Sequence, residues 1–443
     1  MKKIIFTLAL SLVFSAACFA QAWTLERCIE HAIAHNLDVK MQEMNQQAKQ
    51  IDLHTARYSW LPNLNASVGQ NINFGRSESA SGVIENNSAY NTSFSVSSGM
   101  PIFTGFRITN DIQAKKYGVQ AAEESLRRAK ENISVAVAQA FLDVLLRKEI
   151  YKISEETVKL TSENAAKTEI MVNAGNVPLS QLYDIKSRLA SDEARLTSAA
   201  NDVALGLLTL GQLLELQDLE TFDVQLPALA DSAMLSGEFV TPSSRIYEEA
   251  LSVKPQIREA ELQLEGSKAM LRSAESGYLP QLSLNMGVSD GYYYTPESLI
   301  PNVPFANQMN TNLREYIGLS LQIPIFNRFQ VKNNVRSAQV NISNQKLALE
   351  NAKKALYKEI QHAYHNAVAA QKSYSAAQKT VEMSREAFRY ADAKYKTGKS
   401  SVYELTEAQT LLTRSLAEEA QAKYSCVFAL KILDFYRGRE IRL

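Results

Sequence analysis

The sequence contains little glycine and proline for its length, with 17 and 11 of these residues among 443. Because both residues interrupt helices and strands, their scarcity excludes a fold built from many short elements and turns. A surplus of charge is also lacking, since 47 basic residues balance 47 acidic ones. A neutral chain gives no sign of a nucleic-acid partner. We therefore expect long regular elements and no binding of nucleic acid.

Long apolar runs are missing beyond Ala20. No later segment reaches the roughly 18 apolar residues that a membrane-spanning helix needs. Residues 1–20 have the pattern of a secretory signal peptide: two lysines, an apolar stretch at 4–14, then small residues. We predict cleavage after Ala20 and export of the mature chain. Any crossing of a membrane must then use strands.

Cysteine is rare, with three residues in the chain. Cys18 lies in the segment SAAC, which leaves lipidation open as an alternative to simple cleavage. Removal of the signal peptide leaves Cys28 and Cys426, and an oxidising compartment would allow them to form a disulfide. Both align with aliphatic residues in the internal repeat described next. We therefore interpret them as small packing residues.

An internal repeat runs through the chain. The segment LPNL at 61–64 returns as LPQL at 279–282, and PIF at 101–103 returns at 324–326. From the second match onward the offset between the halves stays constant without a gap, so that Gly175 corresponds to Gly398. Such agreement predicts a structural duplication.

Each half has the same predicted order: helix, strand, loop, strand, very long helix, glycine turn and returning helix. The first structural repeat is predicted at 21–222 and the second at 245–443, with a linker at 223–244 between them. Strands are expected at about 61–75, 90–104, 279–294 and 313–326, long helices at about 107–173 and 330–396, and returning helices at about 178–216 and 401–438.

The four strand segments alternate between apolar and polar residues. In residues 64–74, for example, Leu64, Val68 and Ile72 share one face, and small polar residues occupy the other. This period is typical of a membrane β-barrel with one face toward lipid and one toward a lumen. A soluble two-sided sheet is the alternative. Two matched hairpins in an exported chain favour the barrel.

Four strands cannot close a barrel, because single-chain barrels begin at about eight strands. Several chains must therefore share one barrel. Eight strands leave an interior that side chains fill, so a conducting lumen argues for three chains or more. The small, neutral polar face suits a wide and weakly selective passage.

The long helical segments carry heptad repeats, which predict coiled-coil packing. Gly175 and Gly398 follow these segments as C-terminal capping glycines do, and a returning helix begins soon after each. The helices thus form two antiparallel hairpins, with both glycine turns at the end remote from the membrane. These hairpins form either a rigid stalk or a helical continuation of the lumen, which periodicity alone does not separate.

These features resemble the TolC-type outer-membrane efflux protein family over essentially the whole mature sequence. The shared features are the duplicated helix-strand-strand-helix plan, Leu-Pro before each first strand, and Pro-Ile-Phe at the end of each second strand. The most specific motif is KYKTGKSSVYELTEAQTLL at 394–412, with its counterpart MVNAGNVPLSQLYDIKSRL at 171–189. The resemblance implies a mainly α fold with membrane β-strands, in which a homotrimer shares a 12-stranded β-barrel and continues as a coiled-coil α-helical tunnel.

The resemblance also implies a location, a function and a set of partners. The barrel would lie in the outer membrane, in contact with its lipid, and the tunnel in the periplasm. The protein would be the passive exit duct of a tripartite efflux pump or a type I secretion system, together with a periplasmic adaptor protein and an inner-membrane transporter. It further implies a periplasmic gate at Glu404, Glu407 and Asp184, and adaptor contacts at the turns of Gly175 and Gly398.

An enzyme is disfavoured by the sequence. No phosphate-binding glycine loop and no nucleophile–base pattern is visible, and HAIAH at 31–35 lacks the glutamate of a metalloprotease helix. We therefore expect no catalytic activity, no cofactor and no metal site. The main alternative to a channel is a periplasmic or surface coiled-coil scaffold without a pore.

Overall fold

The computed structural model describes residues 23–78, 82–86, 88–219, 221–225, 241–296 and 301–443. The predicted signal peptide with Cys18, and most of the predicted linker, lie outside these residues. Long helices dominate, and one four-stranded sheet accompanies them. This confirms the prediction that the chain combines long helices with four strands of one sheet. In the described part of the chain, no helix is both long enough and apolar enough to span a membrane.

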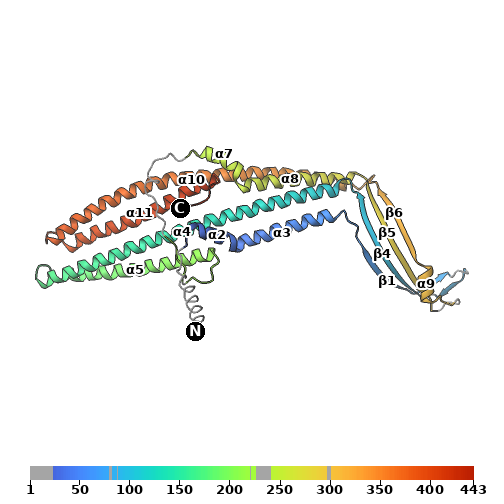
Figure 1. Cartoon of the computed structure of the whole chain (residues 1–443), viewed down its shortest axis with the longest axis horizontal. Coiled ribbons are helices and arrows are strands. Elements are labelled where there is room, and N and C mark those ends of the chain that lie inside the picture. Colours follow the sequence, from blue (N-terminus) through green and yellow to red (C-terminus); the bar gives the residue numbers. More distant parts are fainter. Residues whose placement is uncertain (1–22, 79–81, 87, 220, 226–240, 297–300) are drawn as a thin grey trace, which may run out of the picture. The chain divides into compact units, whose positions relative to one another are not determined.

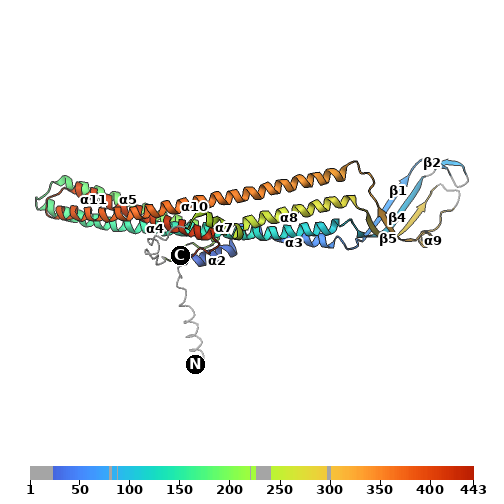
Figure 2. The ribbon, with the colours of Figure 1, turned by 90° about the horizontal axis from the view of Figure 1, so that it is seen from above.

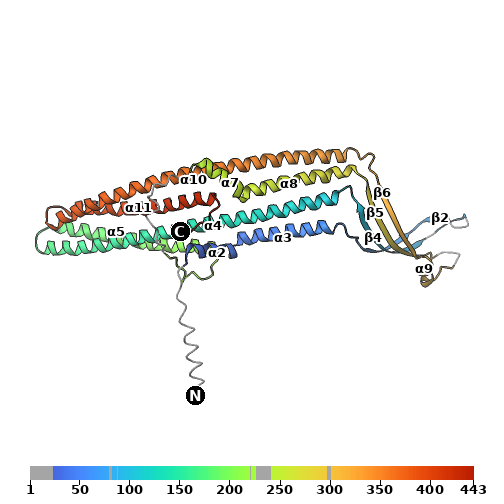
Figure 3. The same cartoon turned by 45° about the horizontal axis from the view of Figure 1, so that its top comes forward.

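The two halves of the chain contain helices of equal length. Helices α4 (Arg107–Asn173) and α10 (Gln330–Lys396) have 67 residues each, which is about 100 Å at ~1.5 Å per residue. Helices α5 (Leu179–Leu213) and α11 (Val402–Tyr436) have 35 residues each. Figure 3 shows α5 returning along α4, and α11 along α10. The starts of α4 and α10 are separated in the sequence by the same number of residues as the two PIF motifs, and so are their ends. The same holds for α5 and α11, as expected for a duplication.

Shorter helices precede the strands in each half. Helices α2 (Leu25–His35) and α3 (Leu37–Tyr58) occupy the first half, and α7 (Ser243–Val253) and α8 (Pro255–Glu275) the second. A single capping residue separates each pair, Asn36 in the first half and Lys254 in the second. A three-residue 3-10 helix, Ser276–Tyr278, follows α8.

Contacts divide the chain into two compact units that do not coincide with the sequence repeats, because each unit draws segments from both halves. The helical unit comprises the described residues up to Met44, Glu124–Arg258 and Glu350–Leu443. The sheet unit comprises Asn45–Glu123 and Glu259–Leu349. The long helices α4 and α10 contribute to both.

The sheet unit contains four antiparallel strands in the order β1-β4-β5-β6 (Figure 1). Their bounds are β1 (Asn65–Asn73), β4 (Ala89–Phe103), β5 (Gln281–Tyr294) and β6 (Arg314–Gln322).

The register of this sheet brings mostly residues of one kind together across neighbouring strands, with Asp290 opposite Phe94 and Glu315 opposite Val288 as charged exceptions on the apolar face. On one face Val68 is opposite Phe94, and Val96 is opposite Val288. On the other face Ser95 lies between Ser67 and Ser289, and its hydroxyl is 2.7 Å from that of Ser67. Because side chains alternate along a strand, the pairing turns the sequence alternation into one apolar and one polar face.

The two connections between paired strands contain structure that the sequence analysis treated as loop. In the first, β2 (Arg76–Glu78) pairs with β3 (Ile84–Asn86). In the second, α9 (Phe305–Thr311) lies against β5, and Figure 2 shows both features at the same end of the sheet. The buried amide of Gln308 accepts a hydrogen bond from the Tyr293 N–H (2.9 Å) and donates one to the Tyr293 carbonyl (2.8 Å). The sequence did not predict that the Gln308 side chain would bond to the backbone of β5 in this way.

The apolar core of the helical unit forms where α2, α4, α5 and α11 meet. Helix α2 buries Leu25, Cys28 and Ala32, which its periodicity places on one face. Its first turn begins at Thr24, whose hydroxyl accepts a hydrogen bond from the Arg27 N–H (3.3 Å), as an N-cap residue does.

Cys28 and Cys426 are both free and fully buried, in agreement with their interpretation as packing residues. Burial raises the pKa of the Cys28 thiol from 9.0 to about 12, against a smaller opposing effect of Arg27. Because this thiol keeps its proton longer in the folded state, its contribution to stability is complete below pH 9 and lost as the pH rises toward 12.

We predict that Cys28 does not react with a thiol reagent at pH 8 in the native protein and reacts fully after denaturation. The reagent needs the thiolate, and both burial and the raised pKa suppress it. Mass spectrometry of native and denatured samples after alkylation provides the measurement, with Cys426 as an internal second thiol. Labelling of native Cys28 at the rate of a free thiol would contradict the buried, protonated state.

Candidate functional site

The glycine turns have the same hydrogen-bonded geometry in both halves of the chain. The N–H of Gly175 bonds to the carbonyl of Val172 and that of Asn176 to Met171, both at 2.9 Å. Gly398 and Lys399 repeat this pattern at 3.0 Å. This is the Schellman arrangement, and it requires a left-handed residue, here with φ of 74° and 70°. A Cβ at either glycine would meet no atom within 4 Å, so backbone conformation rather than crowding requires glycine here.

Glu404 and Glu407 lie in the first turns of α11, and both are exposed. Ser401 caps the helix by accepting a hydrogen bond from the Glu404 N–H (3.3 Å). The Glu404 carboxylate accepts a hydrogen bond from the Ser400 hydroxyl (2.7 Å). The spacing Ser401-x-x-Glu404 has the sequence pattern of a capping box, and in the structure the Glu404 carboxylate bonds to Ser400, the residue before the cap, in place of the Ser401 N–H. Glu407 lines a shallow groove beside Tyr403.

Asp184 is exposed on α5, one turn after the start of that helix. Among the residues that the structure describes, no hydrogen bond or ion pair joins it to Glu404 or Glu407. The three carboxylates therefore lie on two separate helix starts of one chain.

A column of buried polar residues fills the part of the helical unit nearer the glycine turns, and the sequence analysis missed it. Along α4 the column occupies positions four, three and four apart, the spacing of a coiled-coil seam. Its members on the four long helices are Thr157, Thr161, Asn164, Thr168, Asp192, Ser384, Tyr395, Gln409 and Ser415. A search for polar residues at heptad positions would have found its α4 part.

Hydrogen bonds across this column connect the two helical hairpins. The Thr168 and Tyr395 hydroxyls are 2.6 Å apart, which joins α4 to α10. The Gln409 amide donates to the Thr161 hydroxyl (2.7 Å), which in turn donates to the Asp192 carboxylate (2.9 Å). Each such bond contributes only about 1 kcal/mol net, because water offers the same groups equivalent partners. This end of the hairpins is therefore held by polar contacts together with a small apolar cluster that includes Ile185, Val402 and Leu405.

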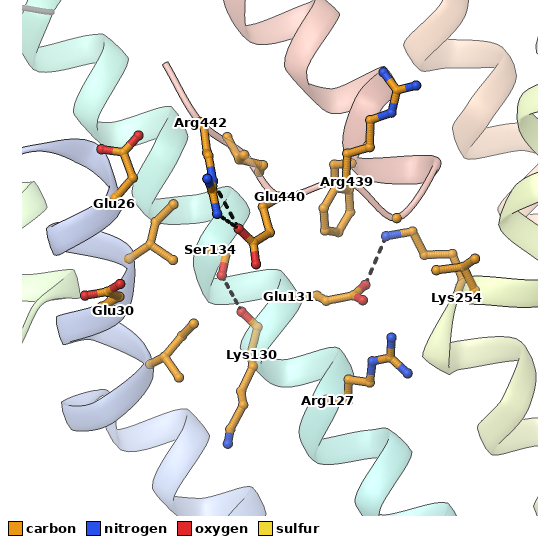
Figure 4. A pocket seen from close by; sticks show the side chains of 16 residues that line it. Glu26, Glu30, Arg127, Lys130, Glu131, Ser134, Lys254, Arg439, Glu440 and Arg442 are labelled. Atoms are coloured by element: carbon orange, nitrogen blue, oxygen red, sulfur yellow. Dashed lines mark hydrogen bonds and ion pairs between the residues drawn. The ribbon is translucent and has the colours of Figure 1, made fainter.

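A charged pocket lies elsewhere in the helical unit, where α2, α4, the end of α7 and the chain after α11 meet (Figure 4). Two ion pairs are drawn within it. Arg442 Nε lies 3.1 Å from Glu440 Oε2, and Lys254 Nζ lies 3.0 Å from Glu131 Oε2. Two of the acidic side chains of the pocket, Glu131 and Glu440, are thus paired with basic ones.

Lys254 connects this pocket to the end of α11. Its side chain is 4% exposed, and its ammonium lies 3.2 Å from the centre of the Phe435 ring. Burial lowers the pKa of Lys254, and the nearby Glu131 carboxylate opposes that effect. Asn36, the corresponding capping residue of the first half, donates from its amide to the Leu213 carbonyl at the end of α5 (3.3 Å). Both halves therefore use the residue after their first short helix to hold the end of a returning helix.

The complete arrangement matches known structures of outer-membrane channels. A crystal structure of CusC superposes with a TM-score of 0.78 at 19% sequence identity, covering 93% of this chain and 91% of that one. At this identity the likeness shows the fold. The profile of the family described as outer membrane efflux protein matches residues 28–215 and again 246–439. The chain belongs to this family and is located in the outer membrane.

Curated relatives are distant in sequence. The probable outer membrane lipoprotein SilC of Salmonella typhimurium is 23% identical over 319 residues, which are 71% of this chain and 64% of SilC. The cation efflux system protein CusC of Escherichia coli strain K12 is 25% identical over 321 residues, which are 70% of this chain and 64% of CusC. The chain thus spans less than two thirds of the length of these relatives.

Proposed function

We propose that the protein is the passive outer-membrane exit duct of a tripartite efflux pump or a type I secretion system. Substrates pass through it from an inner-membrane transporter to the exterior without chemical change, so the protein is a channel and not an enzyme. The observation that carries this proposal is the two-faced four-stranded sheet joined to long helical hairpins in a member of the outer membrane efflux protein family.

The apolar face of the sheet supports contact with lipid. Leu64, Val68 and Ile317 are 76%, 71% and 75% exposed in the single chain. Soluble monomers rarely leave a continuous apolar surface of this kind in water. The opposite face carries serine, asparagine and glycine, which suit contact with water.

The open edges of the sheet support a shared barrel. Strands β1 and β6 each pair on one side within the described chain. Unpaired backbone groups in lipid cost several kcal/mol each, so each edge needs a strand from another copy. We propose a homotrimer, whose three sheets form a barrel of twelve strands around an open lumen.

The partners follow from the need for energy and for a connection across the periplasm. We propose a periplasmic adaptor protein that binds at the turns of Gly175 and Gly398, and an inner-membrane transporter that drives export. The glycines keep these turns compact, and open space surrounds both. A lumen lined by small neutral side chains selects weakly, so the transporter determines which substrates leave.

Membrane fractionation separates this proposal from a coiled-coil scaffold. We expect the native protein in the outer-membrane fraction, extractable only with detergent, and migrating as a trimer that heating converts to the monomer. Co-purification after cross-linking is expected to recover an adaptor and a transporter. A protein that remains in the soluble periplasmic extract as a monomer would overturn the proposal.

We further propose that Glu404, Glu407 and Asp184 form the periplasmic gate. Three copies of these side chains would bring a ring of carboxylates to a narrow mouth, which attracts cations and repels anions. Separation of the hairpins here would exchange the hydrogen bonds of the polar column for others, and it would also open the small apolar cluster of Ile185, Val402 and Leu405 at the helix starts.

The double variant Glu404→Gln/Glu407→Gln tests the charge of this ring. Glutamine also serves at the third position of a capping box, so the start of α11 should be preserved. In single-channel recordings we expect the preference for K⁺ over Cl⁻ to fall, since only the Asp184 carboxylates remain in the ring, and block by a trivalent cation to weaken about tenfold. Glu418→Gln, farther along α11, is the matched control and should leave both unchanged. Unaltered selectivity and block in the double variant would rule out the two glutamates as the gate.

A further inference from the structure

Three basic residues lie at the start of helix α10, where the chain leaves strand β6 (Figure 3). Arg328 precedes the helix by two residues, and Lys332 and Arg336 are neighbours on its surface, four residues apart. All three side chains are exposed. Another side of the helix start is held against the 3-10 helix, since a Cβ at Gly277 would lie 3.0 Å from Val331. We call Arg328, Lys332 and Arg336 the basic cluster.

No acidic residue neutralises the basic cluster. The sequence contains no Asp or Glu between Glu315 and Glu350, a stretch with four basic residues. In the part of the chain that the structure describes, the cluster forms no ion pair or side-chain hydrogen bond, and the Lys332 ammonium lies 5.6 Å from the centre of the Phe329 ring. The first turn of α10 also lacks an acidic residue, so the positive end of the helix dipole adds to the cluster. This surface therefore attracts anions.

The internal repeat shows that the fold does not require this excess of positive charge. The corresponding residues of the first half, 93–126, include three acidic side chains beside three basic ones. There Arg107 pairs with Asp111 (3.7 Å), and Lys115 pairs with Asp52 (3.4 Å). The same structural element thus has paired charges in one half and unpaired charges in the other. The partner of the basic cluster must then come from outside the chain.

Arg328 carries a side chain where the backbone favours glycine. Its φ is 52°, and the corresponding residue of the first half is Gly105, with a φ of 61°. A left-handed residue with a side chain is strained, and such strain is found mainly at functional sites. An arginine at this position supplies a planar guanidinium, which can bind two oxygens of one phosphate group.

Exposed apolar side chains lie directly before the basic cluster. Ile323 and Ile325 continue the apolar alternation of β6 beyond the end of the strand, and Ile325 is 95% exposed. Phe326 is 72% exposed, and its ring meets that of Phe329 edge to face. An apolar stretch, then aromatic residues and then basic residues are expected where a lipid-facing strand leaves a membrane.

We propose that the basic cluster binds the phosphate groups of anionic phospholipids in the leaflet on the periplasmic side of the outer membrane. This inference rests on the proposed function, which places the apolar face of the sheet in lipid. The phosphate supplies the negative charge that the cluster lacks, and the acyl chains contact the exposed Ile325 and Phe326. A free phosphate ion would satisfy only the first of these two surfaces. Each basic residue contributes about fivefold to the preference for an anionic over a zwitterionic lipid.

Lipid titration of the full-length trimer in neutral detergent tests this site. Native mass spectrometry counts the molecules of phosphatidylglycerol or phosphatidylcholine that remain bound. We expect about three phosphatidylglycerol molecules per trimer, one at each cluster, and at least tenfold weaker binding of phosphatidylcholine. Arg328→Asn/Lys332→Gln/Arg336→Gln should abolish this preference. Asparagine tolerates the left-handed backbone, so the fold is retained, which thermal melting verifies.

Three lysines farther along α10 provide a control with the same change in charge. Lys346, Lys354 and Lys358 are exposed and begin ten residues beyond Arg336, about 15 Å along the helix. The variant Lys346→Gln/Lys354→Gln/Lys358→Gln should bind phosphatidylglycerol as the wild type does. Inorganic phosphate at the concentration of the lipid should not displace it.

Several results would overturn the proposed lipid site. These are equal binding of the two lipids by the wild type, an unchanged preference in the cluster variant, loss of the preference in the lysine control, and displacement by inorganic phosphate. Dissociation of the cluster variant into monomers without added lipid would assign the cluster to a contact between chains instead. Trimer formation and ion conduction of the wild type in phosphatidylcholine bilayers test the proposed function separately, because neither needs an anionic lipid.

Discussion

Gly105→Ala is expected to lower the free energy of unfolding by about 3 kcal/mol, the combined effect of a left-handed backbone and of overpacking. Gly105 has a φ of 61° at the junction between β4 and α4. A Cβ there would lie 2.8 Å from both the Leu279 Cβ and the Ser276 carbonyl oxygen, neither of which is the flexible end of a side chain. Thermal unfolding of the detergent-solubilised protein, followed by circular dichroism, measures the loss.

The internal repeat supplies a matched control for this glycine. Arg328 corresponds to Gly105 at the offset that relates the two PIF motifs, and its φ of 52° is also left-handed. Here the chain accepts a side chain, so crowding is absent and only the backbone cost remains. Arg328→Gly is therefore expected to stabilise the protein by about 1 kcal/mol. Unfolding of Gly105→Ala at the wild-type temperature would show that a Cβ at position 105 is not crowded by Leu279.

Lys254→Ala is expected to destabilise the protein by about 3 kcal/mol, since removal of one partner from a buried ion pair leaves the other uncompensated. The ammonium contacts Glu131 and the Phe435 ring, and both contacts would be lost. Glu131 retains partial access to solvent, with 23% of its side chain exposed, which keeps the expected loss below the largest known values. Chemical denaturation with urea provides the measurement.

A second variant separates the ion pair from simple packing. In Lys254→Met/Glu131→Leu both charges are replaced by apolar groups of similar length, a change that is often neutral or stabilising. We expect this double variant to recover most of the stability that Lys254→Ala loses. A double variant as unstable as Lys254→Ala would show that the packing of the lysine stem, and not an unpaired Glu131, causes the loss.

The aromatic pairs at the sheet junctions show how far the duplication extends. Phe103 and Phe106 meet edge to face, with centroids 5.4 Å apart and planes at 87°. Phe326 and Phe329, their counterparts, meet at 5.6 Å and the same angle. Sequence comparison between the halves predicted that these positions correspond. Their geometry, and the left-handed residues between strand and helix, came from the structure.

The proposed gate residues illustrate the limits of local sequence information. The motif after each glycine turn placed Glu404 and Glu407 on one helix start, and the structure places both in solvent on α11. The position of Asp184 relative to them was not predictable from local sequence, because it depends on how separate helix starts, and separate chains, come together. The buried polar column is a similar case, since burial of Asp192 or Gln409 follows from contacts with helices distant in sequence.

The sequence by itself determined the elements: scarce glycine and proline leave two 67-residue helices uninterrupted, and alternation along four short segments separates an apolar from a polar face. These are consequences of backbone geometry, which acts between residues close in the chain. Only the tertiary structure decided which side chains lose contact with water, including Lys254 and the polar column. Burial and hydrogen bonding across helices depend on segments far apart in the chain, and the periodicity of a single segment carries no information about them.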